Sequence, residues 1–266
     1  MEFVNEIKQG LELALRPAEK PALEEVLEQV SRHGVLRGPA DWVFPAWMLY
    51  VEYAAERIAE AFQLSEEERR QLLDFRDTMK RFLLEAQRQA KEKLTALYKA
   101  VTEGTYRMER NRLYVSDDMW MHIGKSTRVS IRGVSAVMHF PDVVKLSQEK
   151  LELFQLGWRA SDEDEKNGRP AMSTTQPWQA FAWTAVRYGK LYVRIVSTNL
   201  TREGASIMIR IIARSWKQRW GNNEAIPHRK PLQERGVEPH PHCAAGRRSS
   251  LSKRGIMRRP PACHCG

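Results

Sequence analysis

The chain has 266 residues, 42% of them hydrophobic, and a formal net charge of +10, a composition that supports a buried core in one large domain or two smaller ones. Its longest apolar run, residues 42–51, spans ten positions and contains Pro45, whereas a membrane-spanning helix needs about 20 apolar residues. The first residues lack the basic start and small-residue cleavage site of a signal peptide, so we expect a cytoplasmic protein with no membrane partner.

The first domain, residues 1–104, is predicted to be helical. Short helices are expected at residues 3–15 and 21–33, and a longer one at residues 41–63, where Pro45 is tolerated only in the first turn. The aromatic residues of this third helix would form either a base-stacking platform or, as their helical spacing favours, part of the core. These residues are Trp42, Phe44, Trp47, Tyr50 and Tyr53.

The strongest helical signal covers residues 65–104. Ser65 followed by Glu68 is typical of a capping box, and Gly104 is placed to end the helix. Between them, apolar residues recur at steps of three and four, which indicates one continuous apolar stripe. The stripe consists of Leu72, Phe75, Met79, Phe82, Ala86, Ala90, Leu94, Leu97 and Val101.

The helices at residues 41–63 and 65–104 are predicted to form an antiparallel hairpin, because the link between them is very short. Two roles for this hairpin are open. It would serve as a dimerisation arm, which predicts a homodimer through residues 41–104, or it would pack as a helical layer on the second half of the same chain.

A second domain of α+β class is predicted over residues 105–226, because the apolar period changes there to that of strands. It would hold a small mixed or antiparallel sheet and two helices. One helix is expected at residues 143–156; after a solvated polar loop at 161–170, the other begins at Pro177 and buries Trp178, Phe181, Ala182 and Val186. The first strands are expected at residues 112–115, 119–123, 127–133 and 135–140.

The last two predicted strands, residues 190–198 and 206–216, would be joined by a loop at 199–205. Because side chains alternate along a strand, one face would bear basic residues from both strands. Such a face would lie against nucleic-acid phosphates or would be an ordinary solvated surface. The candidate DNA-binding residues are Arg194, Arg210 and Arg214, extended by Lys217 and Arg219.

Catalytic motifs are incomplete. The "GKST" at residues 124–127 resembles the end of a phosphate-binding loop, but Met119 stands where that motif needs glycine. No two of the metal-ligand types in this region have a recognised ligand spacing, and all three cysteines lie in the last 24 residues. We therefore assign no catalytic residue, cofactor or metal. The residues weighed as metal ligands are Asp117, Asp118, His122, His139 and Asp142.

Residues 227–266 are predicted to be a disordered basic tail. They hold nine Lys/Arg against two Glu, a local balance of +7, so residues 1–226 carry only +3 of the total charge. Three interpretations remain open: a zinc site, a solvated tail that binds nucleic acid, or a frame-shifted translation that begins where Pro227 breaks the helix started by "GNNEAI". The zinc ligands would come from Cys243, Cys263, Cys265, His240, His242 and His264.

Several strings resemble a known family: "FPDVVKLSQEKLELFQLGWRASDE", "NGRPAMSTTQPWQAFAWTAVRYG", "NLTREG" and "RSWKQRWGNNEAI". They are similar to the Pyrobaculum aerophilum repeat family of the second type, b form, a multicopy crenarchaeal group of variable length. The resemblance covers residues 1–226 and lapses at Pro227. It implies an association with mobile DNA but no established enzyme activity.

Longer relatives, according to this resemblance, continue the helix that starts near Asn223 toward a Leu-Gly-Asp-Gly segment similar to homing-endonuclease motifs. This chain lacks that segment in frame, which implies that metal-dependent nuclease chemistry is lost. We therefore expect a truncated, non-catalytic member that associates with DNA. The alternatives are a helical-hairpin dimerisation module and a remnant of a metal-dependent homing-endonuclease-like protein.

Overall fold

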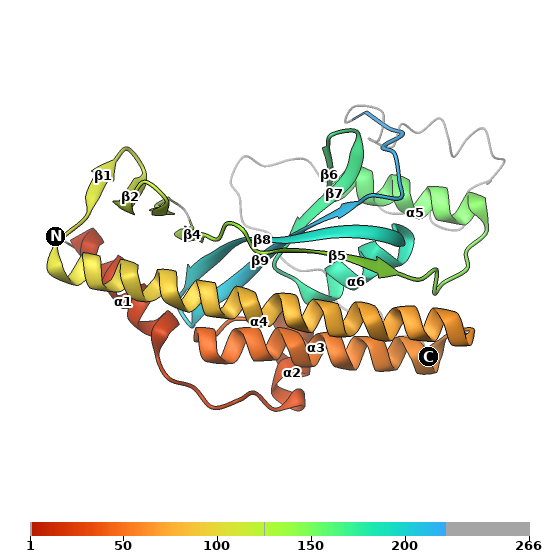
Figure 1. The fold of residues 1–266 in the computed structure, drawn as a ribbon, viewed down its shortest axis with the longest axis horizontal. Coiled ribbons are helices and arrows are strands. Elements are labelled where there is room, and N and C mark those ends of the chain that lie inside the picture. Colours follow the sequence, from red (N-terminus) through yellow and green to blue (C-terminus); the bar gives the residue numbers. More distant parts are fainter. Residues whose placement is uncertain (1, 125, 222–266) are drawn as a thin grey trace, which may run out of the picture. The chain divides into compact units, whose positions relative to one another are not determined.

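The fold has the predicted α+β class, with helices followed by an antiparallel sheet and two further helices (Figure 1). The structure, a computed structural model, describes residues 2–124 and 126–221. The described residues belong to one compact unit. The predicted tail at residues 227–266, with its zinc and frame-shift interpretations, lies outside the described residues.

Four helices make up the first hundred residues, as predicted. They are α1 (Glu2–Leu15), α2 (Leu23–His33), α3 (Ala40–Ala61) and α4 (Glu66–Glu103). The capping box of α4 is confirmed: the Glu68 N–H donates to Ser65 Oγ at 3.2 Å, and the Ser65 N–H donates to Glu68 Oε2 at 2.7 Å. At the other end Gly104 has a φ of 71°, a left-handed conformation that glycine adopts without strain.

The helices form a layer on the sheet. All nine residues of the predicted α4 stripe are buried within the chain, against α3, α1 and strand β5. Phe75 of α4 meets Phe140 of the sheet edge-to-face, with ring centroids 4.9 Å apart. Of the α3 aromatics, Phe44 and Trp47 are core residues, so they do not form a base-stacking surface. A dimer through α3 and α4 would have to use their outer surface.

The sheet has nine strands in the order β1-β2-β3-β4-β8-β9-β7-β6, with β5 also paired to β8. Every pairing is antiparallel. The strands are β1 (Arg107–Glu109), β2 (Arg112–Ser116), β3 (Met119–His122), β4 (Arg128–Ser130), β5 (Ser135–Phe140), β6 (Glu163–Lys166), β7 (Arg169–Thr174), β8 (Gly189–Thr201) and β9 (Gly204–Ala213).

The predicted loop at residues 161–170 is wrong, because most of this segment is the hairpin of β6 and β7. Asn167 and Gly168 form its two-residue turn with φ values of 54° and 70°, the conformation that Asn-Gly adopts in hairpins. The loop predicted at residues 199–205 is also too long. Strands β8 and β9 pair up to Thr201 and Gly204, so only two residues form their turn.

The two later helices differ in part from the predictions. Helix α5 (Gln148–Ser161) begins later than expected and continues past Gly157, while α6 (Pro177–Val186) begins at the predicted proline. On α6, Val186 is buried as predicted, but Trp178 is 42% exposed and Ala182 is exposed; Trp183 is fully buried instead. None of the helices among the described residues combines the length and apolar character needed to cross a membrane.

Candidate nucleic-acid interface

The face of the sheet that points away from the helices carries cations on both of its long strands, β8 and β9. Along β8, Leu191 and Val193 are fully buried toward the helices. Alternation therefore turns Lys190, Tyr192 and Arg194 to the opposite, open face. The predicted alternation on this strand is confirmed.

A first basic row crosses this open face from strand to strand. The Arg214 N–H donates to the Lys190 carbonyl at 2.7 Å, and Arg169 of β7 donates through Nη1 to the Arg214 carbonyl. His139 of β5 pairs with Lys190, and Lys166 of β6 pairs with Arg169. Because neighbouring strands lie about 4.8 Å apart, this row spans roughly 20 Å.

A second basic row lies four residues further along β8, about 13 Å from the first at ~3.3 Å per residue. Arg194 stands directly opposite Arg210 of β9. Arg194 is exposed, and among the described residues it has no carboxylate partner. Arg210 is held by Asp164 Oδ1 at 2.8 Å and by Ser173 Oγ at 3.1 Å, with 16% of its side chain exposed. Within the described part of the chain, Arg194 is thus the cation of this row whose charge is not paired.

An apolar row separates the two basic rows. Val137, Tyr192 and Ile212 are aligned across β5, β8 and β9. The Arg214 guanidinium carbon lies 4.7 Å from the centre of the Tyr192 ring, a cation–π geometry. This contact helps to hold the Arg214 charge over the open face.

The structure brings together three of the five predicted residues. Arg194 and Arg210 are direct neighbours, and Arg214 follows on the same side at the end of β9. Lys217 and Arg219 come after β9 has ended at Ala213. Arg219 is bound to Glu152 of α5, with Nη1 and Oε1 2.7 Å apart, so it belongs to a different surface contact.

Sequence reasoning missed the cations on the strands that flank β8 and β9. The sequence pattern predicts a loop for Lys166 and Arg169, and it singles out His139 only as a candidate metal ligand. An Asn-Gly pair between two polar segments is a hairpin signal that would have placed Lys166 and Arg169 on strands. The position of this hairpin beside β9, with β7 as the paired strand, still follows only from long-range pairing.

A buried ion pair lies on the other side of the same hairpin. Glu163 of β6 is fully buried and accepts from Arg187 Nε and Nη2, both at 2.8 Å. It also accepts from Trp183 Nε1 at 2.9 Å and from Gln218 Nε2 at 2.7 Å. Burial lowers the pKa of Arg187, an effect that Glu163 opposes. Four donors therefore satisfy this carboxylate.

The same cluster holds the segment that follows β9. Arg159 of α5 is buried and donates through Nε to the Trp220 carbonyl at 3.1 Å and through Nη1 to the Glu163 carbonyl at 3.3 Å. The Trp216 Nε1 donates to the Tyr188 carbonyl at 2.7 Å. This polar cluster ties α5, α6 and β6 to the chain beyond the sheet, and its buried hydrogen-bond network fits a structural role.

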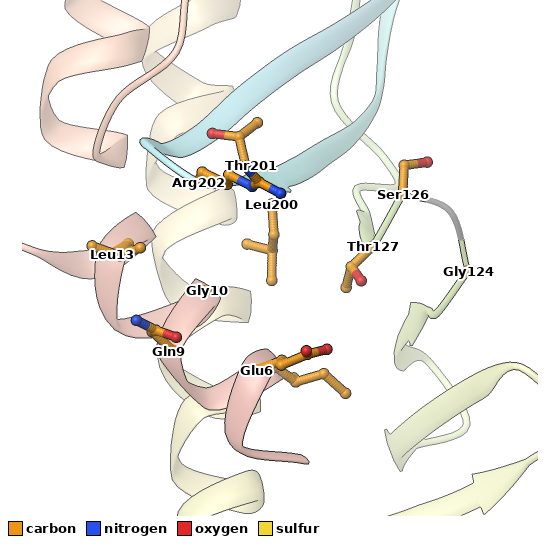
Figure 2. Close-up of a pocket in the computed structure, with 11 residues that line it drawn as sticks. Glu6, Gln9, Gly10, Leu13, Gly124, Ser126, Thr127, Leu200, Thr201 and Arg202 are labelled. Carbon is orange, nitrogen blue, oxygen red and sulfur yellow. The ribbon is translucent and has the colours of Figure 1, made fainter. Parts of the chain in front are cut away.

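The "GKST" segment borders a pocket of about 670 Å³ between α1 and the end of β8 (Figure 2). Gly124, Ser126 and Thr127 line it on one side, and Glu6 and Gln9 of α1 line it on the other. A phosphate-binding loop leads into a helix whose first N–H groups hold the phosphate. Here the segment leads into β4, so the structure lacks that arrangement.

The residues weighed as metal ligands are spread over separate elements. Asp117 lies 3.6 Å from Arg107 Nη2, Asp142 accepts from the Lys145 N–H at 3.0 Å, and His122 contacts the Asn111 side chain at 2.9 Å. Within residues 2–124 and 126–221, no three His, Cys, Asp or Glu side chains gather in a way that could hold a metal ion.

Comparisons with protein-family models, with curated proteins and with solved structures give no match.

Proposed function

We propose that the chain binds duplex DNA through the open face of the sheet and does not itself carry out chemistry on it. The observation that carries this proposal is the pair of basic rows that cross the open face of the sheet. Cations on such a face bind phosphates without reading sequence. We further propose that the protein is a truncated, DNA-associated member of the repeat family that its sequence resembles, linked to mobile DNA.

The distance between the rows supports a duplex as the ligand. The rows lie about 13 Å apart along the strands, close to the ~12 Å width of the major groove of B-DNA. One row would therefore contact the phosphates on one side of the groove while the other row contacts those on the opposite side. The apolar row with Tyr192 would face the groove between them.

The charge balance of this face also supports the proposal. On the outward face of β5 to β9, the described residues include one acid, Asp164, which is bound to Arg210. Residues 1–226 carry a net charge of only +3, so the excess of cations on this face is local. The cations are Lys166, Arg169, Lys190, Arg194, Arg210 and Arg214.

The test is a titration of the full chain with a blunt DNA duplex over a range of salt concentrations. Arg194→Ala should weaken binding. It should also make the fall of log K, the logarithm of the association constant, with log [salt] less steep by about 1, as expected for one lost phosphate contact. Asp164→Asn should strengthen binding, because it removes the acid and releases Arg210. Lys99→Ala, on an exposed part of α4, is the matched control and should change neither quantity.

The basic residues at 227–266 are present in every variant, so the comparison isolates the sheet. If Arg194→Ala and Lys99→Ala bind DNA equally well, with the same salt slope, the open face is not the binding surface. Binding that does not depend on salt in the wild-type chain would also contradict the proposal.

A further inference from the structure

Two aromatic rings lie side by side on the outer face of the β1–β4 strands. Tyr114 of β2 stands directly opposite Trp120 of β3, and their ring centroids are 6.3 Å apart. Both side chains are partly exposed, whereas the alternating residues Leu113, Met121 and Val129 are fully buried toward the helices. We call Tyr114 and Trp120, with the arginines around them, the aromatic face.

The strand registers place the aromatic face on the same side of the sheet as the basic rows. Ser130 of β4 pairs with Ser197 of β8, which itself pairs with Met208 of β9. Met208 lies two residues before Arg210 and therefore on the same side of β9. Met121 of β3 pairs with Val129 of β4, and Trp120 and Ser130 are their next neighbours. Trp120 therefore lies on the same side of the sheet as Ser130. One open surface thus continues from the basic rows to the aromatic face.

Arginines are interleaved with the two rings. The guanidinium carbon of Arg112 lies 4.5 Å and that of Arg132 lies 5.8 Å from the centre of the Trp120 ring, and that of Arg107 lies 5.2 Å from the Tyr114 ring. Arg107 is paired with Glu109 at 3.1 Å. For Arg112 and Arg132, the described residues supply no carboxylate partner, so their charges are available to an anionic ligand.

A further cation lies beside the rings along the strands. Arg128 is exposed and pairs with His122, which in turn pairs with Arg112. Lys93 of α4 reaches this region from the helix side and donates to the Ser130 carbonyl at 3.2 Å. Desolvation by burial lowers the pKa of this amine, and the nearby Arg132 charge lowers it further.

We infer that the aromatic face binds unpaired bases of a single-stranded nucleic acid by stacking on Tyr114 and Trp120, while Arg112, Arg128 and Arg132 contact its phosphates. Bases stack on aromatic rings and on guanidinium planes. Successive bases in a duplex are ~3.4 Å apart, but the two rings are 6.3 Å apart. Two neighbouring bases that each stack on one of these rings must therefore be unstacked from each other. This fits a single strand, and it excludes a ligand whose bases remain continuously stacked, such as a duplex.

This inference rests on the proposed function and narrows its substrate class. With the duplex on the basic rows and unpaired bases on the aromatic face, the preferred ligand is a duplex that carries a single-stranded tail. A blunt duplex would use only the basic rows, and its affinity would be correspondingly lower.

The test compares a blunt duplex with the same duplex carrying an oligo-dT tail, titrated against the full chain at one salt concentration. The tail should raise affinity roughly five- to 150-fold, the range that corresponds to ~1–3 kcal/mol for one stacked base. Trp120→Leu should bring the tailed-to-blunt ratio close to 1, and Trp120→Phe should keep most of it. Trp178→Leu, at an exposed tryptophan of α6, should leave the ratio unchanged.

A second measurement covers the case in which Trp120→Leu does not fold. The tail should quench part of the tryptophan fluorescence of the wild-type chain, and this quenching should be absent in Trp120→Phe. The inference is overturned if the tail gives no added affinity, if the ratio is equal in Trp120→Leu and wild type, or if quenching persists in Trp120→Phe. A failed duplex-binding proposal would look different, because Arg194→Ala would then leave blunt-duplex binding unchanged.

Discussion

The two faces of the sheet are built from the same strands but from opposite kinds of residue. On β9, Ile209 and Ile211 point to the helices and are fully buried. The alternate residues, Arg210 and Ile212, point to the open side and are only partly buried. The helix side needs apolar surface because burial of that surface stabilises the fold. The open side has no such requirement, so it can carry charged side chains.

β6 shows the same contrast at two neighbouring acids. Glu163 points to the helices and is fully buried with Arg187, whereas Asp164 points outward, with 53% of its side chain exposed. The buried carboxylate is bound by protein donors on all sides, while the exposed one neutralises a single arginine. A carboxylate therefore contributes to folding on one face and modulates surface charge on the other.

The largest expected effect comes from breaking the buried pair. Glu163→Ala should lower the free energy of unfolding by about 3–5 kcal/mol, because it leaves the Arg187 charge buried without its partner. Asp164→Ala, one residue further along β6, should change it by no more than about 1 kcal/mol, as for other exposed pairs. Urea denaturation of both variants measures the difference. Equal losses would show that the two faces do not differ in this way.

A smaller effect is expected from truncating isoleucines on the two sides of β9. Ile209→Ala should cost about 2–5 kcal/mol, because it removes buried methyl groups and leaves a cavity in a packed core. Ile212→Ala removes the same atoms from the open face and should cost less than half as much. Thermal unfolding of the matched pair tests this. A larger loss for Ile212 would mean that something covers the open face.

The smallest effect concerns the helix layer at high pH. Burial, with the neighbouring Tyr53 as a second cause, raises the pKa of Tyr50 to about 12 from its ordinary value of 10.0. The folded chain therefore holds this proton more tightly than the unfolded chain does. Stability contributed by the protonated phenol is fully present below about pH 10 and is lost as the pH rises through about 12.

Tyr50→Phe should remove this part of the loss of stability at high pH. In a pH titration followed by the ultraviolet absorbance of phenolate, the variant should lack one of the tyrosines that ionise at high pH. Stability measured by denaturation at intervals between about pH 9 and about pH 12 provides the comparison. Parallel losses in wild type and Tyr50→Phe would contradict the assignment to this residue.

Local signals were sufficient to predict the helical half. The Ser65 capping box, the Gly104 stop and the regular α4 stripe act within a few residues of one another, so the printed sequence shows them directly. The alternation on β8 and β9 was predicted for the same reason. Alternation along each strand therefore predicts a common face for Arg194, Arg210 and Arg214.

Features that depend on long-range strand pairing could not be predicted from such local signals. The acidic segment at residues 161–170 looks solvated because four acids dominate its composition. Its strand character, the burial of Glu163 and the position of Arg169 all depend on β7 pairing with β9 and on Arg187 lying near β6. Trp183 was missed in the same way, because which side of α6 faces the core depends on where α6 docks.

By itself, then, the sequence determined where the helices begin and end and which β8 and β9 residues share a side, since turns, caps and alternation are properties of neighbours in the chain. Only the tertiary structure decided that the helices cover one side of a single sheet and that cations from several strands lie together on the other. Strand order brings together residues that are far apart along the chain, and no short-range pattern records that order.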